Sequence, residues 1–311
     1  MAAAPLTVKP TVRAFPDQTT RRWDPRLYQI ATLAGLLTYG IWWLDLEVQP
    51  ANAVAIIASV LATQLACERL AGRDRFDPRS ALISGLSLCL LLRTGSPDLA
   101  VLAAVIAIAS KFTLRVRGKH VFNPSNLALV ALLLMPVPAW VSPGQWGSFA
   151  TFGFLLACAG GLVVHRALRS DVTYAFLATY AGLLAWRTLK LGDPWTIPLH
   201  QMKSGALILF AFFMISDPRT TPSSRFGRVL FGAAVAAVAH YVTFRLFRTN
   251  GLLWALAALS PTVPLLDLLL PGPRFVWRPD VAQKHPSPKG VRDETLVAPV
   301  SRDPLGAAAR S

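Results

Sequence analysis

The chain has 311 residues, of which 53% are hydrophobic and only 15% are charged, and its mean hydropathy is +0.46. Soluble proteins carry about 25% charged residues, so this composition excludes an ordinary soluble domain. It predicts an all-α polytopic membrane protein, since long stretches such as 51–67 contain no charge at all. The net charge of +15, from 31 Lys and Arg against 16 Asp and Glu, raises a nucleic-acid-binding face as an alternative.

The two ends of the chain differ from its middle. Residues 1–26 are polar and rich in proline, without an apolar stretch that would serve as a signal peptide, so we expect a disordered cytoplasmic tail. Residues 271–311 are rich in Pro, Lys, Arg and Ala, and we expect a second, basic, disordered tail. The transmembrane domain is therefore predicted to occupy 27–270. The three cysteines form no CxxC pair, and we expect no metal site.

Ten apolar segments lie between the tails. A helix needs about 20 residues to cross the hydrocarbon, and several segments approach that length. The third and the eighth have only 13 residues each and hold corresponding places in two halves of five segments. The segments are 27–45, 51–67, 80–92, 98–112, 125–141, 146–164, 172–186, 204–216, 228–247 and 251–270.

Loop charges predict an orientation, because cytoplasmic loops of membrane proteins collect Lys and Arg. With residues 1–26 placed inside, 25 of the 31 basic residues fall on the cytoplasmic side. This asymmetry accounts for the net charge, so we expect no nucleic-acid partner. We predict a multi-pass protein of the bacterial inner (plasma) membrane, embedded in the lipid bilayer, with both termini cytoplasmic.

Five spans in each half require the two halves to be inserted upside down relative to one another. An offset of 120 residues superposes Ser84 and Gly85 on Ser204 and Gly205. Small residues recur in any membrane helix, so the matching places of the two short segments are the stronger argument. Discontinuous helices in such places indicate a binding site near the middle of the membrane.

The first candidate site lies in the loop 111–126, with the sequence KFTLRVRGKHVFNPSN. Asn123 is a good N-cap and Pro124 suits the first helical position, so a helix is predicted to begin here. Its free N–H groups, close to Lys119 and His120, suit a phosphate or an electron-rich ring edge. The alternative is an ordinary helix start with basic anchors.

The second candidate site lies in the loop 214–228, with the sequence MISDPRTTPSSRFGR. Asp217 precedes a proline, Arg219 can bind anionic oxygens, and neighbouring Ser and Thr offer hydroxyls. A structural turn with Asp217 paired to an arginine is the alternative. Together the two loops give the candidate cofactor-binding residues Lys119, Phe122, Asn123, Ser125, Asn126, Ser216, Asp217, Arg219, Thr220 and Thr221; no catalytic residue is assigned.

Three stretches resemble a known family. They are SGLSLCLLLRTGSPDLAVLAAVIAIASK, GKHVFNPSNLALVALLL and FAFFMISDPRTTPSSRFGRVLFG. They are similar to the NqrB/RnfD family, which comprises the B subunit of the sodium-pumping NADH:quinone oxidoreductase and the D subunit of the Rnf electron-transport complex. The resemblance covers roughly 80–270, and ten segments match the family's layout.

The resemblance implies a flavin-carrying subunit of a membrane oxidoreductase, linked to NADH or ferredoxin, that passes electrons to quinone or to partner subunits and is coupled to ion transport. The family attaches FMN to a threonine of a Ser-Gly-Ala-Thr motif after the fifth segment. The connection 136–148 has no threonine, and Ser204-Gly205-Ala206 is followed by Leu207. We therefore expect FMN or riboflavin to bind noncovalently, with Phe122, Phe210, Phe212 and Phe213 available to pack on its ring.

Two other functions stay open at this point. The same inverted-repeat scaffold suits a redox-silent small-solute transporter or channel, or an accessory membrane protein of a natural-product biosynthetic cluster of the enediyne type. A pair of facing histidines, His165 and His240, would suit a haem, but neither lies in a recognisable motif. His240 and Asp267 are the deepest ionisable residues of the apolar segments, and such residues are functional by default.

Overall fold

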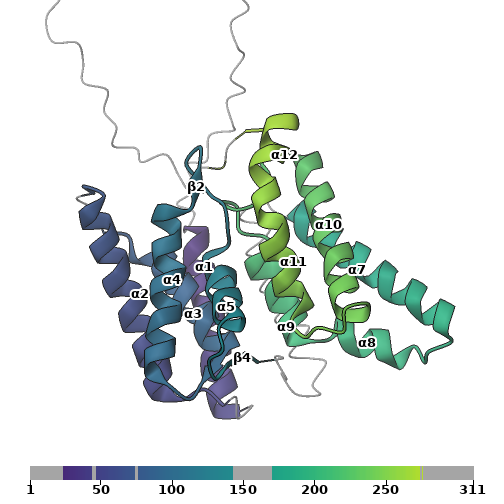
Figure 1. Ribbon diagram of the computed structural model, residues 1–311, viewed down its shortest axis with the longest axis horizontal. Coiled ribbons are helices and arrows are strands. Elements are labelled where there is room, and N and C mark those ends of the chain that lie inside the picture. Colours follow the sequence, from purple (N-terminus) through teal and green to yellow (C-terminus); the bar gives the residue numbers. More distant parts are fainter. Residues whose placement is uncertain (1–23, 44–46, 74–75, 143–169, 274, 276–311) are drawn as a thin grey trace, which may run out of the picture. The chain divides into compact units, whose positions relative to one another are not determined.

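The structure is a computed structural model that describes residues 24–43, 47–73, 76–142, 170–273 and 275. The expected sixth segment, 146–164, and nearly all of both expected tails lie outside these residues. The described chain is helical, with two short antiparallel strand pairs (Figure 1).

The first half contains five helices. They are α1 (Pro25–Trp43), α2 (Pro50–Leu70), α3 (Pro78–Leu91), α4 (Pro97–Thr113) and α5 (Pro124–Leu134). Each begins at a proline, which suits the first turn because its missing N–H would have no helical partner there. Strands β1 (Leu92–Thr94), β2 (Arg115–Val116), β3 (Lys119–His120) and β4 (Ala139–Val141) lie between or after these helices.

The described part of the second half begins with α7 (Ser170–Leu191) and α8 (Thr196–Met202). Helix α9 (Gly205–Leu209) continues directly into a π-helical turn, η1 (Phe210–Met214), which ends the eighth segment early. The half is completed by α10 (Arg225–Phe244), α11 (Gly251–Leu259), the 3-10 turn η2 (Ser260–Thr262) and α12 (Val263–Leu269).

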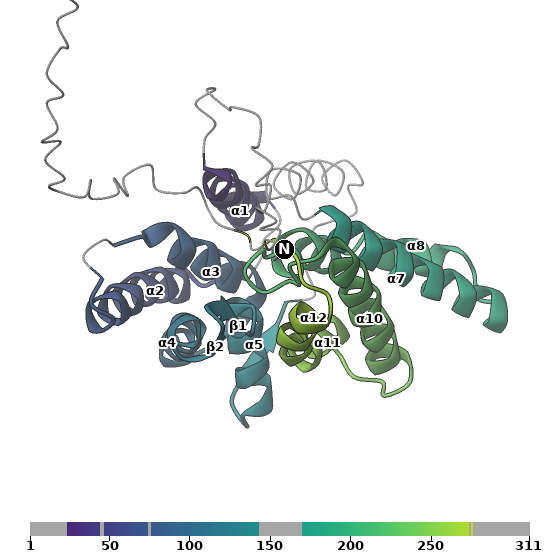
Figure 2. The same ribbon diagram turned by 90° about the horizontal axis from the view of Figure 1, so that it is seen from above.

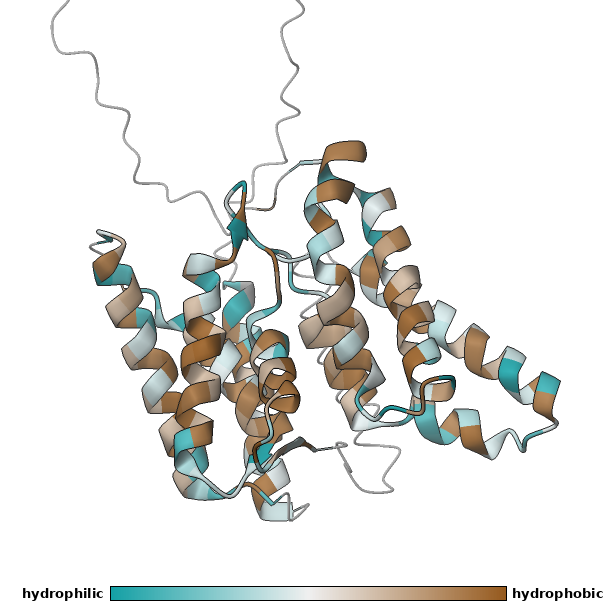
Figure 3. Ribbon diagram, in the orientation of Figure 1, coloured by the Kyte–Doolittle hydropathy of each residue, from teal (hydrophilic) through white to brown (hydrophobic). Residues whose placement is uncertain are grey.

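Three of the described helical stretches are long and apolar enough to cross a membrane. They are Pro50–Leu70, Arg225–Phe244 and Gly251–Leu269. The pair Thr196–Met202 and Gly205–Met214, bent by 46°, gives a fourth if it counts as one broken span. Brown, hydrophobic residues cover the middle turns of α4, α5 and α11 (Figure 3).

The fifth segment corrects a sequence-based expectation. We expected an apolar span over 125–141, but α5 ends at Leu134 and residues 139–141 form β4. Strand β4 pairs antiparallel with β1, with Arg93 opposite Trp140. Pro136 and Pro138 explain the change, because proline cannot continue a helix and supplies no backbone donor.

Packing follows the same order in both halves. In the first half α2 packs on α4 and α4 packs on α5, while in the second α7 packs on α10 and α10 packs on α11. Helix α5 also contacts α11, beside which it lies in Figure 2. Gly232 lets α10 approach α7 closely, because a Cβ there would lie 2.7 Å from the Val172 carbonyl oxygen of α7.

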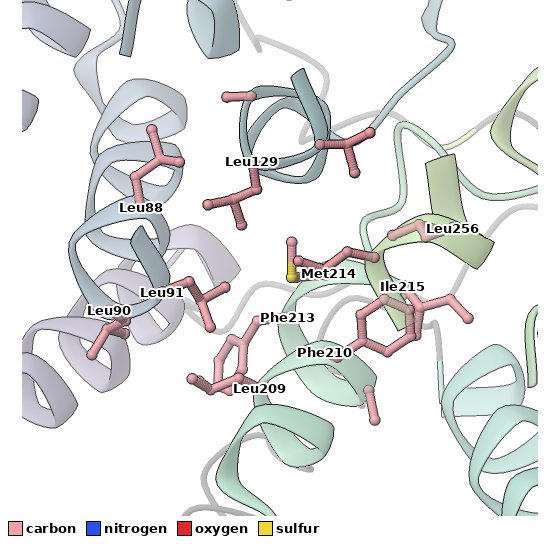
Figure 4. Packing of buried hydrophobic residues seen from close by; sticks show 14 of the residues in the cluster. Leu88, Leu90, Leu91, Leu129, Leu209, Phe210, Phe213, Met214, Ile215 and Leu256 are labelled. Carbon is pink, nitrogen blue, oxygen red and sulfur yellow. The ribbon is translucent and has the colours of Figure 1, made fainter. Parts of the chain in front are cut away.

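The hydrophobic core gathers around the two short segments. Figure 4 shows leucines of α3, including Leu88 and Leu91, near Leu209, Phe213 and Met214 of α9 and η1. All of these side chains are buried. Phe210, Phe212 and Phe213 were expected to be available to pack on a flavin ring. In the structure all three side chains are buried in this core.

Candidate functional site

A tight hairpin places the first candidate residue. Strands β2 and β3 pair with Arg115 opposite His120, and the two residues between them, Arg117 and Gly118, both have positive φ, at 51° and 82°. This is the backbone of a type I′ turn, which matches the twist of the flanking strands. The hairpin turns the chain so that Lys119 and His120 face the second half of the protein.

Asn123 joins the two candidate loops. Its side-chain oxygen accepts a hydrogen bond from the backbone N–H of Asn126, at 3.1 Å, which confirms the predicted N-cap of α5. Its amide nitrogen donates to the carbonyl oxygen of Met214 at the end of η1, at 3.2 Å. One buried side chain thus satisfies a donor at the start of one helix and an acceptor at the end of another.

Lys119 makes the second connection between the loops. Its ammonium group donates to the Thr221 carbonyl oxygen at 2.6 Å and to the Asp267 carboxylate at 2.7 Å. Asp267, on α12, also accepts a hydrogen bond from the Ser223 backbone N–H at 2.6 Å. The Lys119 and Asp267 side chains are only 20% and 17% exposed, so the pair is shielded from bulk water. The hairpin, the loop after η1 and the last helix therefore meet at one point.

A pocket of about 190 Å³ lies at this point. Lys119, Asp267 and Ser223 give it polar walls, and valines and prolines give it apolar ones. Gly272 closes one side, where a Cβ would come within 2.6 Å of the Ser224 backbone nitrogen. The lining residues are Val116, Arg117, Lys119, His120, Val121, Ser223, Val263, Pro264, Asp267, Pro271 and Gly272.

His120 is a buried polar group of this pocket without a full set of hydrogen-bond partners. Its side chain is 8% exposed, and its Nδ1 atom has no hydrogen-bond partner. Burial, together with the positive charges of Arg219, Arg115 and Lys111, lowers the pKa of His120 to about 3. The imidazole is therefore neutral at physiological pH and can offer Nδ1 to a ligand.

Most of the other predicted site residues are held in internal hydrogen bonds. Asn126 donates to the Leu253 carbonyl oxygen and Ser125 to that of Ser84. Ser216 donates to the Phe212 carbonyl oxygen, at 2.5 Å. These bonds tie the helices together, so the side chains support the site from behind rather than lining the pocket.

The turn at Asp217 is likewise internally bonded. Its carbonyl oxygen accepts hydrogen bonds from the hydroxyls of Thr220 and Thr221, and its carboxylate accepts one from the Arg219 backbone N–H at 3.0 Å. Arg219 is exposed and Phe122 half-buried. Of the ten predicted site residues, Lys119 alone lines the pocket.

Sequence reasoning does not place Asp267, His120 or Ser223 in the candidate set. The sequence marks Asp267 as a deep ionisable residue, but its separation from Lys119 by 148 positions hides the pairing. The sequence signal that could have found this pair is an acidic residue in an apolar segment, Asp267, together with a lysine beside a helix start, Lys119.

Other kinds of site find less support. The described residues contain no group of three or more His, Cys, Asp and Glu that could hold a metal ion. His240 packs against Phe244, with ring centroids 4.7 Å apart. His165, its proposed haem partner, lies outside the described residues.

The helices define the class first: this is a helical membrane protein. Residues 138–274 match the model of the NQR2, RnfD, RnfE family. This confirms the family resemblance for the second half, including the stretch around Asp217, whereas the stretch around Asn123 precedes the matched region.

Several curated relatives are named as the D subunit of an ion-translocating oxidoreductase complex. The protein from Cronobacter sakazakii is 29% identical over 48% of this chain and 41% of its own length. Those from Stutzerimonas stutzeri and Halorhodospira halophila are 27% and 25% identical, over 75% and 76% of this chain and 86% and 85% of their own lengths. The chain is thus a divergent relative of the NQR2, RnfD, RnfE family, and it spans less than half of the first of these proteins.

Proposed function

We propose that the chain is an integral membrane electron-transport protein that binds a flavin noncovalently at the pocket beside Lys119. The proposal rests mainly on one observation: the buried Nδ1 of His120 has no hydrogen-bond partner, and it lies in a pocket built from three distant parts of the chain. The names of the relatives, subunits of an ion-translocating oxidoreductase complex, support the redox role. We expect the protein to exchange electrons with quinone or with redox partner subunits.

The pocket suits one edge of a flavin. Its volume of about 190 Å³ is below the ~300 Å³ at which ligand clefts usually begin. The Ser223 hydroxyl, which accepts a hydrogen bond from Lys119 at 3.3 Å, can donate its own hydrogen, and His120 offers an acceptor. Bound there, a flavin would supply one- and two-electron chemistry, while Val263 and Pro264 would exclude water from its edge.

Ten spans in two inverted halves form the proposed scaffold. The matching order of packing supports it, because α2, α4 and α5 contact one another in the same sequence as α7, α10 and α11. Both short segments also end in breaks, α3 at β1 and α9 at the turn after η1. The proposed location is the inner membrane, with both termini cytoplasmic.

Labelling of single cysteines tests this orientation. We expect a cysteine introduced at the exposed residue Arg117, at the rim of the pocket, to be protected from an impermeant thiol reagent in intact cells and to react after the membrane is opened. The background is a variant without Cys67, Cys89 and Cys158. Reaction in intact cells would place the pocket on the outer side and contradict the proposed topology.

Flavin content tests the cofactor. Purified protein should show a flavin absorption band, and denaturing electrophoresis should release all fluorescence, because no threonine stands in the connection 136–148. A fluorescent band that survives denaturation would show that another hydroxyl carries the flavin covalently.

The two joined loops predict which variants lose flavin. Asn123→Ala removes the bond to Met214, and Asp217→Asn removes the charge of the turn. We expect both proteins to insert and fold with reduced flavin content and redox activity. Asn52→Ala is a control for loss of a buried amide away from the pocket, and it should keep its flavin.

If both loop variants keep full flavin and activity, the loops are structural turns. If the wild-type protein is colourless and equilibrates a solute across vesicles, the transporter function stands instead.

A further inference from the structure

The end of α3 that lies beside β1 presents several backbone carbonyl groups at a helix break. The last four carbonyls of any α-helix lack helical partners, and free ones are not tolerated in lipid. Here they are met by protein donors. The Leu91 carbonyl oxygen accepts from the Ser142 N–H at 2.8 Å. In the strand that follows the helix, the Thr94 carbonyl oxygen accepts from the Asn52 amide at 2.6 Å.

Arg93 supplies two further hydrogen bonds. One terminal nitrogen, Nη1, donates to the carbonyl oxygens of Cys89 at 3.1 Å and Leu92 at 2.9 Å. The residue is only 5% exposed. Its guanidinium therefore lies against the carbonyl end of α3, the helix that precedes Arg93 in the sequence.

This buried cation makes no ion-pair contact with a carboxylate of the described residues. Glu47 attracts it electrostatically without such a contact, and its second terminal nitrogen, Nη2, has no hydrogen-bond partner. Arg228 shows the contrast, since it is similarly buried but pairs with Asp171 at both carboxylate oxygens.

Among the described residues, the carbonyl groups at the end of α3 make the direct contacts to the charged group of Arg93. Aligned peptide dipoles place about half a negative charge at the carbonyl end of a helix. In broken-helix transporters such ends and the neighbouring unwound carbonyls coordinate mobile cations. In this protein the same carbonyl position is filled by a guanidinium attached to the chain.

We propose that Arg93 is a tethered cation that occupies the carbonyl end of the broken helix α3 and so excludes mobile metal cations from it. Any cation that crosses the protein must then use a route that avoids this helix end. The proposal is independent of flavin binding, because it concerns backbone carbonyls remote from the Lys119 pocket.

Cation rescue tests the proposal. Arg93→Gln keeps a hydrogen-bond donor but removes the charge, and Arg93→Ala also opens space. Thermal unfolding is measured at constant ionic strength while choline chloride is replaced by sodium or guanidinium chloride. We expect the Tm of both variants to rise by about 5 °C at saturating small cation, as for a ligand that binds only the folded state. The wild-type protein should not respond.

Two controls separate this effect from general destabilisation. Arg93→Lys retains a tethered charge and should show no cation response. Leu92→Ala removes buried volume from the same strand and should lower the Tm. Added cation should not restore the Tm of this variant.

Equal responses to choline and sodium in Arg93→Gln would overturn the proposal. So would a cation response as large in Leu92→Ala as in Arg93→Gln, or a wild-type Tm that rises with added anions, which would assign Nη2 to an anion site.

Discussion

The two short segments end in different ways. At the end of α3, carbonyl groups are satisfied by a buried guanidinium, a strand pairing and the Asn52 amide. At the end of η1, the Met214 carbonyl oxygen is satisfied by the neutral amide of Asn123, which comes from 91 positions away. The first end is closed by Arg93 from the adjoining strand together with donors from α2 and from the chain around β4. The second end is closed by a loop that brings a lysine and a pocket with it.

This difference indicates which of the two helix ends can bind a ligand. At the α3 end the tethered charge of Arg93 takes the place of a ligand, and among the described residues two polar atoms there lack a hydrogen-bond partner, Nη2 of Arg93 and Oδ1 of Asn52. The η1 end keeps an ion pair, a neutral imidazole and a cavity together. We therefore expect substitutions at the η1 end to change both stability and function, and those at the α3 end to change stability alone.

Removal of the Asp267 carboxylate should have the largest effect at the η1 end. Asp267→Ala leaves Lys119 without its carboxylate and the Ser223 N–H without an acceptor, and we expect a cost of about 3 kcal/mol in the free energy of unfolding. Chemical unfolding in detergent measures it. Asp267→Asn, which keeps an oxygen for Ser223, should lose less, and equal losses would show that the backbone bond contributes little.

Acidification should act on the same end through His120. Its buried environment lowers the pKa of His120 to about 3, whereas an unfolded histidine titrates near 6.5. Between these values the unfolded state binds a proton that the folded state does not, so stability falls as pH falls. The loss is on the order of 2 kcal/mol between pH 6.5 and pH 5.

A His120→Gln variant isolates that contribution. Its unfolding free energy, measured across the same pH range, should show a shallower slope than that of the wild-type protein. A guanidinium does not titrate here, so the Arg93 end should be unaffected. Parallel slopes in the two proteins would mean that folding does not lower the pKa of His120.

Asn123→Ala should destabilise by about 2 kcal/mol, roughly 1 for the lost cap and the rest for the lost hydrogen bond to the Met214 carbonyl oxygen, which keeps only the longer bond from the Asp217 N–H at 3.4 Å. Thermal melts compared with Asn123→Ser, which can still cap α5 but does not reach Met214, divide the two parts. A Ser variant as stable as wild type would show that the link between the loops is not needed for folding.

The smallest effect is expected at the α3 end. Asn52→Ala removes the hydrogen bond to the Thr94 carbonyl oxygen and should cost about 1 kcal/mol, with flavin content unchanged. Loss of flavin in this variant would mean that the two ends are coupled and would remove the distinction between them.

Local features of the fold can be predicted from the sequence. The Asn-Pro pair predicts the start of α5 and its cap, because both preferences act within one turn. The short third and eighth segments are also visible, and α3 and α9 with η1 are short. The length of an apolar segment can be predicted because it depends only on residues that are neighbours in the sequence.

Contacts between distant residues cannot be predicted in the same way. The hairpin at Arg117-Gly118 escapes sequence reasoning because a positive φ at arginine has no strong sequence signature. The sequence predicts a span for the fifth segment because its residues after Leu134 are apolar, although two prolines and the pairing of β4 with β1 decide its structure. The Lys119–Asp267 pair joins positions that no periodicity relates.

The separation between Lys119 and Asp267 has a consequence for biosynthesis. Membrane helices enter the bilayer as the ribosome makes them, from the N-terminus onward. The hairpin that carries Lys119 is complete long before α12, 148 residues after the lysine, has been translated. During that interval the ammonium group must be hydrated or held by something other than its final partner. Assembly of the pocket is therefore among the last steps of maturation, and a chain that stops before Asp267 reaches the membrane with most of its helices and without its binding site.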